Sequence, residues 1–270
     1  MVSCKVCIFQ FWLTVLIASC AIAADCPMWR YDASRSGATS ESLPADLQRS
    51  WSRDLGPNHI AWSEDVRLQF DACYQPIVVG QTMFVASSRN DTVGAFDTRT
   101  GEAKWQFFAD GPIRLAPVAH AGRIYFGADD GFFYCVDANN GQLIWKADVA
   151  MEERRILGNE RLISLWPVRG GAVLVGNQMF FTVGVWPFEG LQTYQFTVSD
   201  TGNQVPEFRT SVPNSLSPQG YLVASDGKLF FPGGRAKAGS MQTGRPVSLD
   251  YDAPGKTDWH VAASGPLLFH

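Results

Sequence analysis

Short hydrophobic runs, each followed by a cluster of turn residues, recur through the middle of the chain. Residues 77–79 and 82–85 are separated by a glycine turn, and 124–127 forms a similar run. Runs of this length between Gly, Asp and Asn predict antiparallel strands joined by tight turns. The content of glycine (25), tryptophan (9) and phenylalanine (18) suits such a protein. We therefore predict an all-β fold.

One pattern of residues occurs twice, in 95–105 and again in 135–145. An aspartate, a glycine and a tryptophan each recur 40 positions apart, as Asp97 and Asp137, Gly101 and Gly141, and Trp105 and Trp145. The aspartate can accept hydrogen bonds from turn amides, and the glycine supplies a positive φ. The tryptophan can bury a large ring against the next repeat, so we expect both rings to be largely buried. A period of about 40 residues predicts the four-stranded antiparallel blades of a β-propeller.

Further copies of the repeat are incomplete. Copies near 76–110 and 117–149 are followed by two degraded copies, and residues 47–55 alternate like a last blade strand without a blade before it. We expect that strand to complete the final blade. We predict a partial propeller of about four to five blades over 24–270, with an unclosed edge that promotes self-association.

The pattern Ala/Val-x-Asp-x-x-(Thr/Asn)-Gly-x-x-x-Trp resembles the repeat of the PQQ-type, or quinoprotein-like, β-propellers. The segment 29–37 also resembles the lead-in before the first blade of bacterial members. That group includes quinoprotein dehydrogenases and the non-enzymatic assembly lipoprotein BamB. The resemblance implies a bacterial propeller that is BamB-like in the broad sense, but a fold alone does not fix a function.

The N-terminus predicts export. Lys5, an apolar run at 6–18 and Ala-Ile-Ala at 21–23 form a signal peptide over 1–23. Alternatively, 17–20 resembles a lipobox, with the signal ending at 19 and Cys20 as the lipidated first residue of the mature chain. Both alternatives place the protein in the periplasm or at the outer membrane of the bacterial envelope. Membrane contact is expected only through such a lipid anchor.

The cysteines and the net charge narrow the possible chemistry. If the signal is cleaved after residue 23, Cys26, Cys73 and Cys135 remain, either as one disulfide with a free thiol or as three thiols. The net charge of −4 argues against a nucleic-acid-binding surface, which requires a basic face.

An insert near 151–167 is the candidate partner-binding segment, because the third copy follows the second by about 20 residues more than the period. Positive charge and an aromatic ring gather there, in Arg154, Arg155, Arg161, Trp166 and Arg169. Arginine and tryptophan are favoured at interfaces, which indicates a surface for an acidic or aromatic partner. Alternatively, the arginines pair with the glutamates of the insert, as surface charges commonly do at little energetic gain.

Catalytic chemistry is not predicted. The resemblance to quinoprotein dehydrogenases implies calcium ligands, a catalytic aspartate and commonly two adjacent cysteines, and the adjacent pair is absent. The sequence Asp129-Asp130-Gly131 favours a hairpin turn over calcium ligands. We predict a non-catalytic scaffold without cofactor that binds proteins in the cell envelope, related to outer-membrane assembly. The alternative is a dehydrogenase-like protein with PQQ and calcium.

Overall fold

The structure is a computed structural model in which part of the chain is described. The described residues are 24–43, 45–64, 69–158, 160–186, 188–199, 205–211, 219–231, 248–250, 262–264 and 267–269. The signal segment with Cys20 lies outside them, as does the degraded turn at 201–202. The described residues form strands, turns and irregular segments, without a helix.

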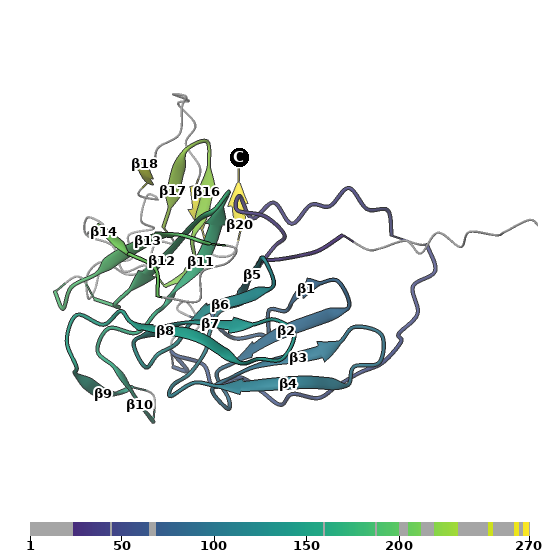
Figure 1. The fold of residues 1–270 in the computed structure, drawn as a ribbon, viewed down its shortest axis with the longest axis horizontal. Coiled ribbons are helices and arrows are strands. Elements are labelled where there is room, and N and C mark those ends of the chain that lie inside the picture. Colours follow the sequence, from purple (N-terminus) through teal and green to yellow (C-terminus); the bar gives the residue numbers. More distant parts are fainter. Residues whose placement is uncertain are drawn as a thin grey trace, which may run out of the picture.

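Two four-stranded antiparallel sheets form the first two blades (Figure 1). Blade 1 consists, in sheet order, of β1 (Ile77–Val79), β2 (Thr82–Ser87), β3 (Thr92–Asp97) and β4 (Ala103–Phe108). Blade 2 consists, in sheet order, of β5 (Val118–His120), β6 (Arg123–Gly127), β7 (Phe132–Asp137) and β8 (Leu143–Asp148). Each blade is a simple meander of consecutive strands, as the repeat predicts.

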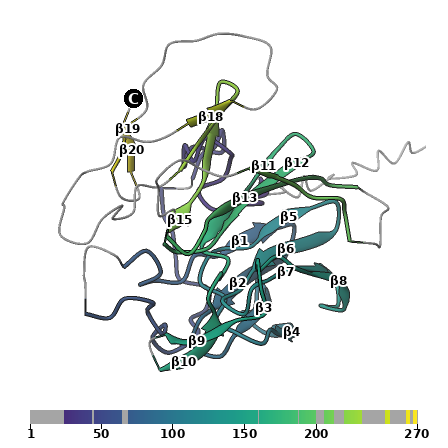
Figure 2. The same cartoon turned by 90° about the vertical axis from the view of Figure 1, so that its left-hand side faces the viewer.

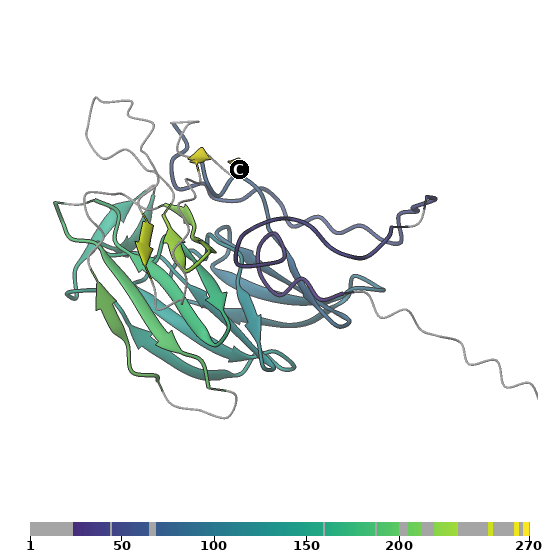
Figure 3. The same ribbon diagram turned by 90° about the horizontal axis from the view of Figure 1, so that it is seen from above.

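The degraded copies also form sheets. Blade 3 contains β11 (Gly170–Val175), β12 (Gln178–Val183), β13 (Gln192–Thr197) and β14 (Arg209–Ser211), and β15 (Gly220–Tyr221) pairs in parallel with β11. Blade 4 contains β16 (Val223–Ser225), β17 (Lys228–Phe230) and β18 (Ser248–Asp250). Two further pairs are β9 (Arg155–Gly158) with β10 (Arg161–Ser164), and β19 (Ala262–Ser264) with β20 (Leu267–Phe269). The twisted sheets stand side by side (Figures 2 and 3), so the predicted all-β, partial propeller fold is confirmed.

The repeated turn has the same geometry in both blades. Gly101 and Gly141 have φ values of 74° and 71°, in the left-handed region that glycine adopts without strain. The carboxylate of Asp97 accepts hydrogen bonds from the amides two and three residues later, at 2.9 and 3.1 Å. Asp137 does the same at 2.8 and 3.2 Å. The turn conformation expected from the sequence is thus confirmed.

Two tryptophans, Trp51 and Trp105, lie on the glycine turn of the blade that follows them. The indole N–H of Trp105 donates to the carbonyl of Ala138 at 3.0 Å, and a Cβ placed on Gly141 would lie 2.5 Å from the Trp105 ring. Trp51 contacts the first blade in the same way, with its indole N–H 2.8 Å from the carbonyl of Thr98. The glycine therefore has a second role, because any side chain there would displace the ring.

Two expectations about tryptophans need correction. Residues 47–55, around Trp51, form no strand, because none of the described strands lies beside them to complete a ladder. Trp145 is 7% exposed, as expected, but Trp105 is only half-buried. The ring of Trp145 contacts Phe196 of the next blade, whereas Trp105 lies against a glycine turn that covers less of it.

A substitution at the turn glycine tests this docking. Gly141→Ala is expected to destabilise the protein by about 2–4 kcal/mol, because left-handed strain of about 1–2 kcal/mol is joined by a clash with Trp105. Gly122→Ala is the matched control, since Gly122 has a φ of 72° but nothing within 4 Å of an added Cβ. Urea unfolding of both variants measures the difference, and equal losses would show that the ring does not constrain this turn.

The segment that precedes blade 1, from Cys26 to Arg35 and here called the lead-in segment, crosses the inner strands of the blades. Cys26 exchanges two backbone hydrogen bonds with Val78 of β1, at 2.7 and 3.0 Å. The carbonyl of Pro27 accepts from Ala119 of β5 at 2.7 Å, and the carbonyl of Ala33 accepts from Ala224 of β16 at 2.8 Å. These bonds join the first two blades to the fourth through one short segment.

Arg35 also connects the lead-in segment to the third blade. Its buried guanidinium donates to the carbonyls of Ala172 in β11, Leu222 and Trp29, at 2.8, 2.9 and 2.9 Å. Burial lowers the pKa of Arg35 to about 10, which leaves it charged at neutral pH. The guanidinium also lies over the ring of Tyr221. A cation bonded to three carbonyls fixes the lead-in at the centre of the blades.

Aromatic rings fill the spaces between blades. Phe133 of β7 stacks on Phe181 of β12, with ring centroids 4.0 Å apart. Phe107 of β4 contacts both Phe126 and Tyr134 of blade 2, at 5.7 and 5.6 Å. Such contacts add to the area burial that holds neighbouring blades together.

The three described cysteines carry free thiols, so no disulfide joins them. Across the described part of the chain, no helix has the length and apolar character needed to span a membrane.

Candidate functional site

The two ends of the blades differ. The turn face carries the short glycine turns, including 97–101 and 137–141. The loop face, at the opposite ends of the strands, carries the β2–β3 and β6–β7 loops and the longer connections 109–117 and 149–169. Longer connections offer more variable surface, so the loop face is the better candidate for function.

Four charged side chains form a buried cluster beneath the loop face. Arg114 donates through Nε to Asp129 and through Nη1 to Asp71, both at 2.6 Å. Arg169 binds Asp129 in a bidentate manner, at 3.1 and 2.9 Å. All four are buried, with exposures between 0 and 5%. Two arginines and two aspartates thus neutralise one another without solvent.

The cluster joins segments that lie far apart in the sequence. Asp71 comes from the segment before blade 1 and also accepts the amide of Ala61. Arg114 comes from the connection between the first two blades, Asp129 from the β6–β7 loop, and Arg169 from the residue before β11. Because each ion pair crosses from one blade to another, the cluster fixes the loop face.

Within the cluster, each charged group stabilises the ionised form of its partners. Burial alone would raise the pKa of Asp129, but Arg169 and Arg114 hold it below its ordinary value. Burial likewise opposes the charge of Arg114, and Asp129 and Asp71 raise its pKa above the usual one. Asp129 and Arg114 therefore stay ionised at neutral pH, and removing one of them leaves an uncompensated buried charge.

The hairpin turn predicted at Asp129-Asp130-Gly131 is present, and the side chains of the two aspartates point to different partners. Asp130 does form the hairpin turn, accepting the amide of Phe132 at 2.9 Å and the hydroxyl of Tyr134. Asp129 instead turns inward to the two arginines. This contact could not be predicted from the local sequence, because both arginines are 15 or more residues away.

The predicted insert contains a hairpin, β9 with β10. Its register pairs Leu157 with Leu162 and Ile156 with Ile163, and Glu160 in the turn has a φ of 63°. Ile163 is buried, but Leu157, Leu162 and Ile156 are 78, 57 and 38% exposed. The hairpin stands off from the four-stranded sheets (Figure 1) and presents aliphatic side chains to solvent.

Two anchors hold the hairpin on the loop face, and both engage β10. The amide of Ser164 donates to the carbonyl of Asp129 at 2.7 Å. The guanidinium of Arg161 forms an ion pair with Asp91 in the β2–β3 loop of blade 1. The hairpin thereby spans the loops of both blades.

The five residues proposed for partner binding do not form one surface. Arg154 and Arg155 are exposed, whereas Arg161 is half-buried against Asp91. Trp166 and Arg169 are buried, which corrects their assignment to a contact surface. Trp166 donates its indole N–H to the carbonyl of residue 189, and Arg169 belongs to the ion-pair cluster. The aliphatic residues of the hairpin were missed, although Gly-Asn-Glu between two apolar runs is a recognisable turn signal.

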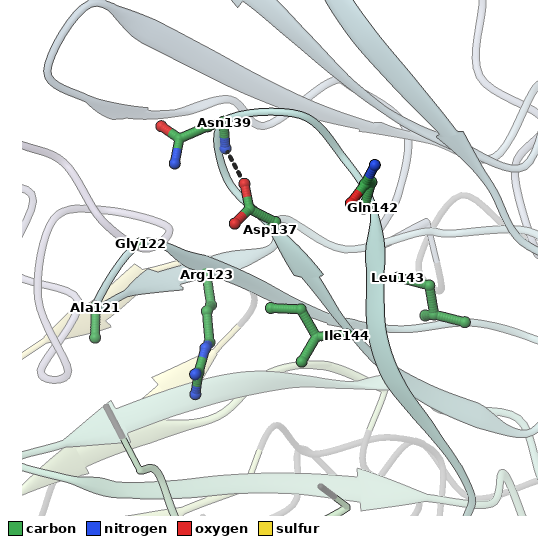
Figure 4. A pocket seen from close by; sticks show the side chains of 8 residues that line it. All are labelled: Ala121, Gly122, Arg123, Asp137, Asn139, Gln142, Leu143 and Ile144. Carbon is green, nitrogen blue, oxygen red and sulfur yellow. Dashed lines mark hydrogen bonds between the residues drawn. The ribbon is translucent and has the colours of Figure 1, made fainter. Parts of the chain in front are cut away.

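The turn face carries a polar, open cavity of about 500 Å³ beside blade 2. Figure 4 shows Arg123, Asp137 and Ile144 on its wall. The carboxylate of Asp137 is held by the amide of Asn139, and Arg123 donates to the carbonyl of Ser199. Asp137 therefore stabilises the turn, and Arg123 contributes to the contact with blade 3.

The sheets, the glycine turns and the docked tryptophans define a propeller of the PQQ-like class. A family model described as "Outer membrane protein assembly factor BamB" matches residues 44–245. This match covers most of the chain, which therefore belongs to that family.

Curated relatives include two alcohol-oxidising enzymes. The chain is 25% identical over 179 residues to "1-butanol dehydrogenase (cytochrome c)" of Thauera butanivorans, covering 61% of this chain and 24% of that protein. It is 26% identical over 152 residues to "Alcohol dehydrogenase (quinone), dehydrogenase subunit" of Gluconobacter oxydans, covering 51% and 20%. The chain thus spans about a quarter or less of the length of these relatives.

Solved structures include members of both groups. The quinohemoprotein alcohol dehydrogenase from Comamonas testosteroni has a TM-score of 0.45 at 20% identity, covering 73% of this chain and 28% of that one. BamB from Moraxella catarrhalis has a TM-score of 0.34 at 13% identity, covering 63% and 58%.

Proposed function

We propose that this chain is a non-catalytic, exported propeller protein that binds other proteins in the bacterial cell envelope. The observation that carries the proposal is the β9–β10 hairpin, which exposes Leu157 and Leu162 on the loop face beside Arg154 and Arg155. Exposed aliphatic side chains next to arginines are suited to protein contact. Outer-membrane assembly, the role in the description of the family model, is the first process to test.

The charged groups of the loop face support a structural role rather than cofactor binding. The guanidiniums of Arg114 and Arg169 are bound to Asp129 and Asp71, so neither offers a free charge to an anionic ligand. The described residues contain no group of three or more His, Cys, Asp or Glu side chains placed to hold a metal ion.

A quinoprotein dehydrogenase-like function is the second candidate. The names of the relatives from Thauera and Gluconobacter favour this function, since both denote alcohol oxidation and the second also names a quinone. The test adds PQQ and calcium to the purified protein and follows binding by calorimetry and dye-linked alcohol oxidation. We expect neither binding nor turnover. Turnover that needs both additions would replace the scaffold proposal.

Site-specific photo-crosslinking in the native host tests the scaffold proposal. A photoreactive residue at Leu157, on the hairpin, is expected to capture one or a few defined envelope proteins. The matched control carries the same residue at Asn139, an exposed position on the turn face. Equal capture at both positions, or none at Leu157, would contradict the proposal.

A further inference from the structure

We propose that the partner adds a strand along the outer edge of β9 and that the added segment alternates apolar and acidic residues. This inference rests on the proposed function and specifies how the hairpin would be used. It follows from the backbone of β9, from the side chains around it and from the way β10 is engaged.

The hydrogen-bonding pattern gives β9 an open edge. The amide of Leu165 donates to the carbonyl of Arg154 at 2.8 Å, so residues 154 and 165 form a hydrogen-bonded pair. Bonded and non-bonded pairs alternate in an antiparallel ladder, so Arg155 and Leu157 direct their N–H and C=O groups away from β10. No described residue bonds these outward groups. An edge of this kind is a template for another strand.

The opposite edge of the hairpin is already engaged. Ser164 lies across from Arg155 and directs its amide outward from β10, where it donates to the carbonyl of Asp129. Arg161, at the start of β10, is tied to Asp91. A new strand therefore has its full approach only along β9.

The side chains around the edge define the added segment. Leu157 and Leu162 are opposite each other on one face of the hairpin, and both are exposed. An apolar side chain on the added strand would cover them. Side chains alternate between the two faces of a strand, so Arg154 lies on the face opposite Leu157. Arg154 is exposed and forms no ion pair with a described residue, so it favours carboxylates at the alternate positions of the added strand.

A second copy of this chain is a poorer occupant of the same edge. Pairing β9 with β9 of another copy about a two-fold axis would bring both sets of Arg154 and Arg155 to one small interface. Like charges at that distance repel one another. Light scattering at the concentrations used for binding distinguishes this outcome, because a dimer blocked by the peptide below would indicate self-pairing and overturn the acidic partner.

A peptide experiment tests the edge directly. The probe is a capped, fluorescent peptide of alternating valine and glutamate, and the control probe has lysine in place of glutamate. We expect saturable binding of the glutamate probe, measured by fluorescence polarisation, and at least tenfold weaker binding of the lysine probe. Arg154→Glu should reverse that preference. Equal binding of the two probes, or none, would overturn the inference.

Proline variants isolate the backbone contribution. Leu157→Pro removes an outward N–H that bonds nothing within the hairpin, and Leu157→Ala keeps the N–H while removing the side chain. The glutamate probe should bind the proline variant about tenfold more weakly than the alanine variant, as one lost hydrogen bond implies. Leu162→Pro and Leu162→Ala, the matched pair on β10, should bind equally. Circular dichroism verifies that all four fold.

The two proposals fail separately. If crosslinking at Leu157 captures a partner but proline and alanine at 157 bind the probe equally, strand addition is wrong and protein binding stands. If crosslinking captures nothing, the proposed function fails whatever the peptide shows.

Discussion

Asp129→Asn is expected to lower the free energy of unfolding by about 3–5 kcal/mol, measured by urea denaturation at neutral pH. The carboxylate accepts three hydrogen bonds from Arg114 and Arg169. An amide removes the negative charge and leaves two buried guanidiniums with Asp71 as their one remaining acidic partner in the cluster. The magnitude is that of a broken buried ion pair.

Asp130→Asn is the matched control for this prediction. Asp130 is the next residue and is also buried, but burial raises its pKa and no arginine pairs with it. A neutral amide is closer to the form that this environment favours, so the loss should stay below about 2 kcal/mol. Equal losses for the two variants would mean that the arginines do not depend on Asp129.

The stability lost in Asp129→Asn is expected to depend on pH. The folded-state pKa of Asp129 lies below its unfolded value of about 3.9, so its contribution to stability is fully present above that value. The contribution is lost as the pH falls through the folded-state pKa. The difference in stability between the wild type and Asp129→Asn should therefore be constant from about pH 5 to 7 and shrink below about pH 4. A difference that grows toward acid would contradict the ionised cluster.

The repeat was predictable because its cause is local. Asp97 and Gly101 act within one turn, so the sequence carries the whole mechanism. The 40-residue spacing then predicts a four-stranded blade, and the tryptophan predicts packing against the next blade. The contact of Trp105 with Gly141 follows the same logic, since the identical pair recurs one blade earlier with Trp51 and Gly101.

The loop face was not predictable for the opposite reason. Asp71, Arg114, Asp129 and Arg169 meet only after three blades have formed, and no spacing in the sequence connects them. Arg169 was expected at the surface because charged residues are seldom fully buried without a partner. The partner here is remote in sequence, so its presence depends on the tertiary structure.

The missing strand around Trp51 illustrates a third case. Alternating residues predict a strand only if another strand supplies the ladder. The side chain of Trp51 still makes the contact typical of the repeat, since its indole N–H donates to the carbonyl of Thr98. The self-association expected from an unclosed edge stays a prediction, for which light scattering of the mature protein is the measurement.

Trp145→Ala is expected to cost about 3–5 kcal/mol, the range for removing a large buried aromatic side chain. The ring packs between Tyr125 and Phe133 of its own blade and contacts Phe196 of blade 3, at centroid distances of 6.1, 6.3 and 5.9 Å. The cavity would therefore open at the boundary between blades 2 and 3. The surrounding strands could not move in to fill it without breaking their pairing with neighbouring strands.

Trp105→Ala is the matched comparison, and it should cost less, about 2–3 kcal/mol, because part of its side chain already faces solvent. The two losses of stability have different physical causes, which hydrogen exchange can distinguish. Trp145→Ala removes a contact between two sheets, so hydrogen exchange should speed up in β12 and β13 as well as in β8. Trp105→Ala should loosen the turn at Gly141 while leaving blade 3 protected. If Trp145→Ala left exchange in blade 3 unchanged, the tryptophan would be stabilising its own blade alone, and the repeat would not be the element that joins one blade to the next.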